Sequence, residues 1–332
     1  MSALAFEVPA PLEAYEPPAE RDAVRMLVAR GDGSLAHAQF RDLPQLLEPG
    51  DLVVVNTSAT LPAALHAGAL DLHLSTPLPG GPPNRWVVEL RRDGEPFSGA
   101  AAGQTIDLPA GARAELRAPY LGRRLWVADL RLPGPLLDYL GRHGRPIRYR
   151  YVRDEYPLAA YQTVYATEPG SAEMPSAGRP FTPEIVTALV ARGIAVAPVV
   201  LHTGVSSLEE GESPYPERFR VPAATARLVE TTRAAGGRVL AVGTTVVRAL
   251  ESAAQRDGSL AAAEGWTSHV VTPATGVAVV DGLLTGWHEP DSSHLGLLEA
   301  VAGRDLVTRS YDAALAHGYR WHEFGDVHLL LP

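Results

Sequence analysis

Residues 237–252 read GRVLAVGTTVVRALES, and this stretch decides the fold prediction. Its apolar run over 238–242 predicts a buried strand, and the apolar spacing after Gly243 predicts a helix over 244–256. A strand that leads through a glycine into a helix is half of a crossover unit, which joins parallel strands. The alternation continues with helices at 182–192 and 222–235, strands at 194–201 and 52–55, two helices after 291–293 and near 304–317, and a last strand at 327–331. We therefore expect an α/β fold with a barrel-like main domain and a mainly parallel sheet.

The start of the 244–256 helix is a candidate ligand site. Open α/β folds bind small ligands beyond the carboxyl ends of their strands, and Gly243, Thr244 and Thr245 offer N–H groups and hydroxyls there. Arg248 and Glu251 lie about one turn apart on the same helix, so they could face one ligand, the arginine pairing with a carboxylate and the acid accepting from a ribose or an amine. Alternatively, the two side chains form an ion pair on the helix surface.

The run from Tyr161 to Thr182, YQTVYATEPGSAEMPSAGRPFT, is built like a ligand-binding loop. Its glycines and prolines fix the path of the chain, and its polar side chains stand just before a helix start. Thr182 is the expected N-cap, followed by Pro183 as the first helical residue. The alternative is an ordinary connection between a strand and a helix. The candidate cofactor-binding residues of the loop are Tyr161, Gln162, Tyr165, Ser176 and Gly178.

Composition narrows the class of protein. A chain of 332 residues with 46% hydrophobic content can bury a large core. The absence of cysteine excludes disulfides, thiolate nucleophiles and cysteine-ligated metal sites, and no histidine group has metal-ligand spacing, so no metal is expected. The apolar runs are too short to cross a bilayer, and the N-terminus lacks the pattern of a signal peptide. We expect a cytoplasmic protein that does not associate with membranes.

The block between residues 63 and 150 differs in composition from its flanks. It contains the Pro/Gly-rich piece STPLPGGPPN at 75–84 and short alternating strands. We expect a small β domain over 63–150, inserted between a first part (1–62) and a second part (151–332) of the main domain. The expected strands of this block are 85–90, 113–118 and 125–130, and a short helix is expected at 136–140.

One strongly basic strip lies in a chain whose net charge is −9. Residues 142–153 read RHGRPIRYRYVR, in which arginines alternate with tyrosines. This pattern suits phosphate contact combined with aromatic stacking, and Arg145, Arg148 and Arg150 are the candidate substrate-binding residues. The alternative is a twisted strand whose arginines are solvated.

Two histidines follow expected strands or lie in polar loops. His202 ends the 194–201 strand, and Gly204 allows a sharp turn just after it. His288 lies in the loop WHEPDSS at 287–293. Either imidazole suits a general base, although each could instead make a structural hydrogen bond.

Two polar positions flank the last expected elements. Asp291 or Ser292 can cap the following helix. Asp326, which precedes the last strand, could orient a histidine or hold a ligand amine, or it simply closes a turn.

A set of short pieces, taken in order, carries a resemblance that covers nearly the whole chain. They are Arg21-Asp22, Leu27-Val28, Phe40–Pro44, Pro49–Asn56, Tyr161–Ala166, Gly170-Ser171, Ser176–Gly178 with Phe181-Thr182, Leu201-His202 with Gly204, Gly237–Ser252, His288 with Pro290 and Ser292, and Gly325-Asp326. Their order and spacing together resemble the S-adenosylmethionine:tRNA ribosyltransferase-isomerase family of queuosine biosynthesis.

The resemblance implies a barrel-like α/β domain with an inserted β domain, and S-adenosylmethionine as co-substrate. Enzymes of this family join the ribosyl group of S-adenosylmethionine to a 7-aminomethyl-7-deazaguanine in tRNA and rearrange the ribosyl group to give epoxyqueuosine. Adenine and methionine are released. A sulfonium acidifies the adjacent C5′ hydrogens, so a base is required, with His288 and His202 as candidates and Asp326 beside them. We expect His288 to matter more, because Glu289 can raise its pKa and Trp287 can exclude water. Asn56 and Ser292 are expected on the substrate side.

The departures from the family concern the acceptor. Ala59 and Ala64 stand where the family has arginines, so we expect weaker tRNA affinity, with a salt slope lower by about one unit for each missing phosphate contact. Two alternatives therefore remain: the same chemistry on a small deazapurine-type acceptor, or a relative that binds a nucleotide or tRNA without catalysis.

Overall fold

The structure is a computed structural model, and it describes residues 6–122, 124–205, 215–290 and 292–332. Within these ranges, no helix combines the length and the apolar character that crossing a membrane requires.

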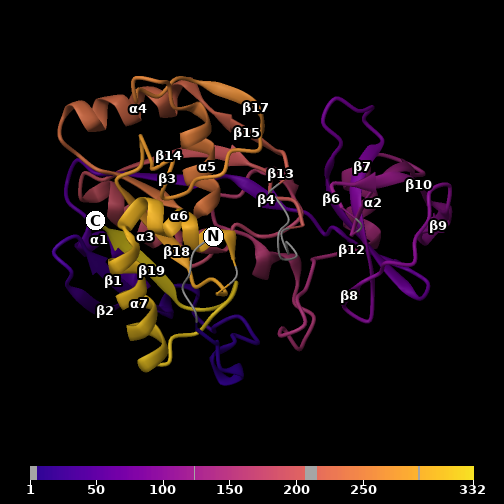
Figure 1. Ribbon diagram of the computed structural model, residues 1–332, viewed down its shortest axis with the longest axis horizontal. Helices are drawn as coiled ribbons and strands as arrows, with labels where there is room; N and C mark the ends of the chain where they lie inside the picture. Colours follow the sequence, from indigo (N-terminus) through magenta and orange to yellow (C-terminus); the bar gives the residue numbers. More distant parts are fainter. Residues whose placement is uncertain (1–5, 123, 206–214, 291) are drawn as a thin grey trace.

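A large mixed sheet runs through the larger part of the molecule, at the left of Figure 1. The pairs β14/β3, β3/β16, β16/β18 and β19/β1 run parallel, and the other neighbouring pairs run antiparallel. Its edge strands, β17 and β2, are not paired with each other in the described part of the chain. In spatial order the strands are β17 (Ala263–Thr267), β15 (Glu217–Val221), β14 (Ala195–Leu201), β3 (Leu52–Asn56), β16 (Val239–Val242), β18 (Gly282–Gly286), β19 (Val327–Leu331), β1 (Arg25–Arg30) and β2 (Leu35–Gln39).

The α/β class is thus confirmed, whereas the prediction of a mainly parallel sheet is wrong. That prediction assumed that a single crossover helix joins each strand to the next, because such a helix returns the chain so that the next strand runs parallel. Between β18 and β19 the chain passes through two helices, and these two strands pair antiparallel. The neighbouring strands β14 and β15 also pair antiparallel. The expected parallel arrangement is present in the group β14, β3, β16 and β18 and in the pair β19/β1.

A second, antiparallel sheet is built from the middle of the sequence and lies to one side of the molecule, at the right of Figure 1. Register shifts in the β6/β7 and β10/β11 pairs mark irregularities that bend such a sheet. Its strands in spatial order are β12 (Gly144–Arg145), β5 (Ala64–Ala67), β6 (Leu70–Pro77), β7 (Arg85–Arg92), β11 (Leu125–Arg131), β10 (Arg113–Tyr120) and β9 (Thr105–Asp107), with β8 (Glu95–Pro96) also paired to β7. A short parallel pair, β4 (Ser58–Thr60) and β13 (Glu168–Ser171), follows β3.

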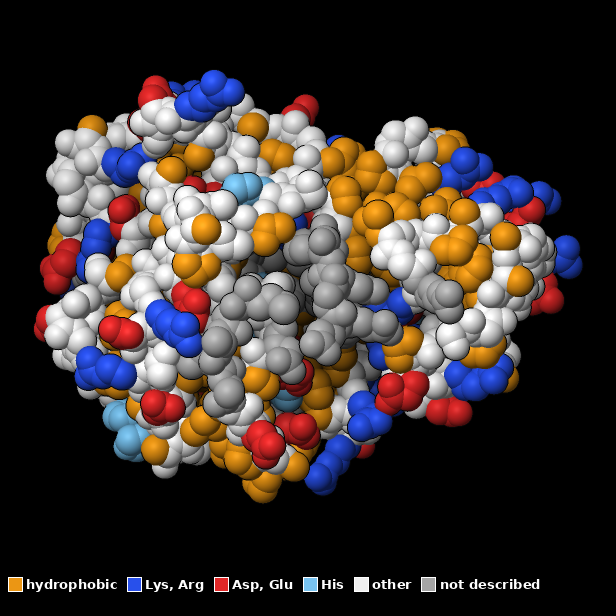
Figure 2. Space-filling view, viewed as in Figure 1, with side chains coloured by type: hydrophobic (Ala, Val, Ile, Leu, Met, Phe, Trp, Pro, Cys, Tyr) orange, Lys and Arg blue, Asp and Glu red, His pale blue; other side chains and the backbone are white. Residues whose placement is uncertain are grey.

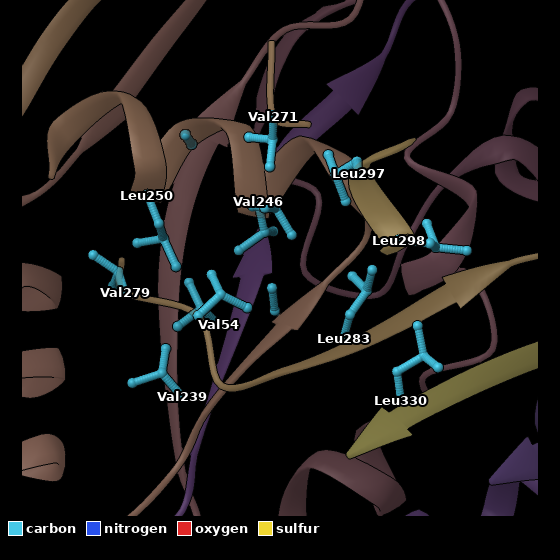
Figure 3. Packing of buried hydrophobic residues seen from close by; sticks show 14 of the residues in the cluster. Val54, Val239, Val246, Leu250, Val271, Val279, Leu283, Leu297, Leu298 and Leu330 are labelled. Atoms are coloured by element: carbon cyan, nitrogen blue, oxygen red, sulfur yellow. The ribbon is translucent and has the colours of Figure 1, made fainter. Parts of the chain in front are cut away.

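Helices cover both faces of the large sheet, because its central strands are apolar on both sides. Along β3, Leu52 and Val54 pack in one core with α4 to α7, while Val53 and Val55 pack in the other core with α1 and α3. Figure 3 shows the first of these cores, with side chains of α5 and α6 above the strands. The helices are α1 (Leu43–Leu46), α2 (Leu136–His143), α3 (Pro183–Ala191), α4 (Ala223–Ala234), α5 (Thr244–Ala253), α6 (Ser293–Ala302) and α7 (Arg304–Ala316), and the short 3-10 helices are η1 (Ala10–Leu12), η2 (Arg21–Ala23), η3 (Phe40–Asp42), η4 (Pro109–Gly111), η5 (Leu158–Tyr161) and η6 (Ser176–Gly178).

The predicted helix start at Thr182 is confirmed. Its side chain accepts a hydrogen bond from the Ile185 N–H, and Pro183 is the first residue of α3. The predicted helix after Gly243 is also present, but it ends at Ala253 rather than at residue 256.

Candidate active site

Four of the sequence-predicted residues lie at one edge of the large sheet. Since β14, β3, β16 and β18 are mutually parallel, their carboxyl ends lie along the same edge. Asn56 ends β3, His202 follows β14, Gly243 follows β16 and His288 follows β18. Such an edge is where open α/β sheets bind ligands.

Asn56 joins three of the segments at this edge. Its buried amide donates to the Leu201 carbonyl over 2.9 Å and to Thr245 Oγ1 over 3.2 Å. Its oxygen accepts from the N–H groups of Leu201 and Ser58. The side chain therefore fixes the ends of β3 and β14 against the start of α5.

His202 is held by a chain of hydroxyls. Its Nδ1 lies 2.7 Å from Ser58 Oγ, which lies 2.6 Å from Ser171 Oγ. One ring face packs on Gly170, where an added Cβ would come within 2.4 Å of Nδ1. Burial, followed by the charge of Arg218, lowers the pKa of His202 below its usual 6.5, so the ring is neutral at neutral pH.

Adding a methyl group at Gly170 tests this packing. Gly170→Ala places the new carbon inside the contact distance of the imidazole, so the ring must move away from Ser58. We expect turnover to fall at least about tenfold, with a smaller change in the urea midpoint of unfolding, because the strain is local. Gly296→Ala is the matched control, since nothing lies within 4 Å of its added Cβ. Unchanged turnover in Gly170→Ala would show that the position of the His202 ring is not critical.

The start of α5 is tied to the His202 turn through Glu217. One oxygen of Glu217 accepts from the Gly204 N–H over 3.1 Å, and the other pairs with Nη1 of Arg248. Arg248 also donates from Nε to the His269 carbonyl. Its Nη2 is buried and has no hydrogen-bond partner among the described residues. The guanidinium is thus held in place while its Nη2 can still donate to a further acceptor.

Glu251 binds backbone N–H groups of the segment before β18. Its carboxylate accepts from the N–H groups of Ala278, Val279 and Val280 over 2.8 to 3.2 Å. These bonds fix the chain that leads into β18. Among the described residues, Arg248 and Glu251 therefore bind separate partners and do not pair with each other.

The Tyr161–Thr182 loop packs along the same edge. Gln162 bonds through its amide to both the N–H and the carbonyl of Thr60, as a strand neighbour would. The buried Tyr165 hydroxyl has no partner within the described ranges, and an added Cβ at Gly178 would come within 2.1 Å of it. Ala177 of η6 approaches Gly243, whose φ of 90° favours glycine. The loop is therefore in contact with the start of α5.

His288 lies in a cluster of half-buried histidines beside the buried His328. Its Nε2 is 2.9 Å from Thr285 Oγ1, and its ring packs beside that of His294 at 4.6 Å. Burial, followed by the neighbouring histidines, lowers its pKa well below 6.5. The expectation that Glu289 raises this pKa is wrong, and the Trp287 indole stacks on His328 instead.

Ser292 caps α6 as predicted, with its Oγ accepting from the His294 N–H over 3.2 Å. Asp291, the other predicted cap, lies outside the described residues. Asp326 is buried, and the hydrogen bonds it accepts in the described chain come from Arg25 and from the Arg320 N–H. These contacts favour the interpretation in which Asp326 closes a turn.

Several site residues were not predicted from the sequence. Ser58 and Glu217 are two of them, and the alternating pattern ERFRV that starts at Glu217 is the signal that marks β15. Another is Glu323, which accepts from the Tyr151 hydroxyl. Burial raises the pKa of Glu323 to about 7, and Glu173 adds to this while Tyr151 and Arg179 oppose it.

The raised pKa of Glu323 predicts a pH-dependent stability difference. Between pH 4.5 and 7 the unfolded chain loses this proton and the folded chain keeps it, so the contribution of Glu323 to stability falls as pH rises. Relative to the parent, Glu323→Gln should gain about 3 kcal/mol of unfolding free energy across this window. Urea denaturation at a series of pH values measures the difference, and Glu264→Gln, at an exposed carboxylate, controls for charge removal. A Glu323→Gln difference that does not change with pH would contradict the prediction.

The basic strip lines a cavity instead of forming the alternative twisted strand. Only Gly144–Arg145 is strand, and the segment after it borders a cavity of about 360 Å³ next to the smaller sheet. Arg145 pairs with Asp71 and Glu155, and Arg150 pairs with Glu95. Figure 2 shows basic and acidic side chains together along the lower rim between the two parts of the molecule.

Comparison with known proteins gives one consistent result. The family model described as queuosine biosynthesis protein matches residues 1–330. The S-adenosylmethionine:tRNA ribosyltransferase-isomerase of Geobacter sulfurreducens is 35% identical over 97% of this chain and 96% of its own, and that of Symbiobacterium thermophilum is 36% identical over 98% of each. The solved structure of S-adenosylmethionine tRNA ribosyltransferase from Thermotoga maritima is similar with a TM-score of 0.58 and 29% identity, covering 99% of this chain and 100% of that one. The chain therefore belongs to the queuosine biosynthesis protein family of S-adenosylmethionine:tRNA ribosyltransferase-isomerases.

Proposed function

We propose that this protein transfers the ribosyl group of S-adenosylmethionine to a 7-aminomethyl-7-deazaguanine in tRNA and rearranges it to give epoxyqueuosine. Full-length similarity to enzymes of that name supports the proposal. The observation that carries it is the meeting of Asn56, His202 and the start of α5 at one carboxyl edge of the sheet. A reaction that releases both adenine and methionine from one donor molecule needs a polar site whose side chains are held in place by rigid elements.

The donor is assigned to the edge between α5 and the Tyr161–Thr182 loop. Two buried polar atoms without a hydrogen-bond partner in the described part of the chain support this assignment, Nη2 of Arg248 and the Tyr165 hydroxyl. A buried donor without a partner is costly, and the carboxylate of S-adenosylmethionine would satisfy Nη2. Gly170 and Gly178 allow the loop backbone to pack against His202 and Tyr165 beside this edge.

We assign the role of base to His202 ahead of His288. The sequence-based expectation that His288 matters more than His202 relied on a raised pKa of His288, whereas burial lowers that pKa. His202 has the arrangement expected of a positioned base, since Ser58 holds Nδ1 and Gly170 supports the ring face, which leaves Nε2 to take a proton from C5′. His288 stays the second candidate.

The acceptor is assigned to tRNA, bound through Arg145, Arg148 and Arg150, with Ser292 on the substrate side. Ala59 and Ala64 are both buried, in β4 and β5. The lower salt slope expected from their replacement of family arginines remains a prediction. We further propose that residues 63–150 form an inserted domain between the parts 1–62 and 151–332, and that the protein acts in the cytoplasm.

Release of adenine from S-adenosylmethionine tests the proposal. The parent protein should release adenine when tRNA carrying the deazaguanine is added, and none without an acceptor. Release with the free deazaguanine alone would favour the small acceptor, and no release with either would favour a binding protein without catalysis.

A further inference from the structure

The cavity beside the basic strip has the size and lining of a binding site. Its volume of about 360 Å³ lies within the range of about 300–1,000 Å³ for small-molecule pockets. Among the described residues, five arginines and three acidic side chains line it. The arginines are Arg91, Arg145, Arg148, Arg150 and Arg153.

Two of these arginines carry positive charge that no carboxylate neutralises in the described structure. Arg148 donates to the carbonyl of Arg153 over 2.8 Å, and the Arg153 guanidinium lies 4.3 Å from the centre of the Tyr15 ring. Neither forms an ion pair within the described ranges, in contrast to Arg145 and Arg150. In a protein of net charge −9, this local excess favours a phosphate, which guanidinium groups bind well.

An aromatic stack supports one wall of the cavity. Tyr149 lines the cavity and stacks on Tyr151 with ring centres 5.7 Å apart and planes 12° apart. Tyr151 stacks in turn on His322 at 3.8 Å and 12°, and its hydroxyl donates to Glu323. The loop before β19 therefore fixes the Tyr149 ring from within the protein. A ring held in this way is a platform for base stacking, which contributes about 1–3 kcal/mol for each base.

We propose that this cavity binds one unpaired nucleotide of an RNA loop, with the base stacked on Tyr149 and adjoining phosphates on Arg148 and Arg153. The inference rests on the proposed function, since the RNA is its tRNA acceptor. A paired base cannot reach the ring, because bases in an A-form helix are stacked on their neighbours. S-adenosylmethionine also carries a base, but it has no phosphate, and its positive sulfonium is repelled by the unpaired arginines.

Binding of an RNA stem-loop, and of the blunt duplex of its stem, tests the inference. Tyr149→Ala should weaken stem-loop binding by about 5- to 150-fold and leave duplex binding nearly unchanged, while Tyr149→Phe keeps the parent affinity. Arg148→Ala and Arg153→Ala should each lower the slope of log K against log salt by about 0.7. Arg142→Ala is the matched control, because Arg142 is exposed on α2 and does not line the cavity.

Three outcomes would overturn the inference. The first is a stem-loop affinity of Tyr149→Ala equal to that of the parent, and the second is a salt slope in Arg148→Ala and Arg153→Ala equal to that of Arg142→Ala. The third is competitive displacement of the stem-loop by S-adenosylmethionine. If Tyr149→Ala does not fold, the slopes of log K against log salt in Arg148→Ala and Arg153→Ala decide whether the inference holds. Adenine release by the parent is measured in parallel. If the parent releases adenine but stem-loop binding does not depend on Tyr149, the cavity proposal is rejected and the proposed enzymatic function stands. If stem-loop binding depends on Tyr149 but no adenine is released, the proposed enzymatic function is rejected and the cavity proposal stands.

Discussion

His202→Ala is expected to lower turnover by about 10²–10⁴-fold while the dissociation constant for S-adenosylmethionine changes little. The ring is held by Ser58 and Gly170 at the carboxyl edge of the sheet, so its loss removes the proposed proton acceptor without removing Arg248 or the start of α5. Single-turnover adenine release measures the rate, and titration calorimetry measures the affinity. Because the pKa of His202 is lowered, the acid limb of the pH–rate profile should lie below pH 6.5.

His66→Ala is the matched control, since His66 is an exposed histidine of the smaller sheet. A silent His202→Ala variant together with a large loss in His288→Ala would transfer the base to His288. Full activity in both variants would reject histidine as the base.

Asp326→Ala is expected to lower the free energy of unfolding by about 3 kcal/mol. The carboxylate is buried and accepts from the N–H, Nε and Nη2 of Arg25 and from the Arg320 N–H. Its removal leaves two backbone donors and a guanidinium without their acceptor where β1 meets β19. Urea denaturation followed by circular dichroism measures the loss.

Asp107→Ala provides the comparison, because Asp107 forms an exposed pair with Arg113 and such pairs contribute about 0–1 kcal/mol. If the two variants lose the same stability, the hydrogen bonds of Asp326 to Arg25 and Arg320 do not stabilise the fold as expected. A folded and stable Asp326→Ala variant that has lost turnover would restore Asp326 as a catalytic candidate.

Local patterns gave the elements of the fold but not all of their directions. The apolar run before Gly243 and the Thr182-Pro183 helix start were sufficient to predict β16, α5 and α3. The direction of β19 was not predictable in the same way, because it depends on how the two helices after Ser292 pack together on the sheet. Strand direction is a tertiary property, and apolar periodicity contains no information about it.

The candidate site was predictable where strand ends determine it. Asn56 ends a strand, His202, Gly243 and His288 each follow one, and the parallel pairings bring these ends to one edge. The partners of charged groups were less predictable, since they come from distant segments. Glu251 meets the backbone of 278–280, Asp326 meets Arg25, and the burial that lowers the pKa of His288 is not visible in the residues beside it.

Transfer of labelled S-adenosylmethionine carbon to tRNA tests the central claim most directly. The protein is incubated with tRNA carrying the 7-aminomethyl-7-deazaguanine and with donor labelled either in the ribose or in the methyl group. We predict that the ribose label appears in the tRNA while the methyl label leaves with methionine. Methyl label in the tRNA, or no ribose label there despite bound donor and tRNA, would contradict the claim that this protein is a ribosyltransferase-isomerase.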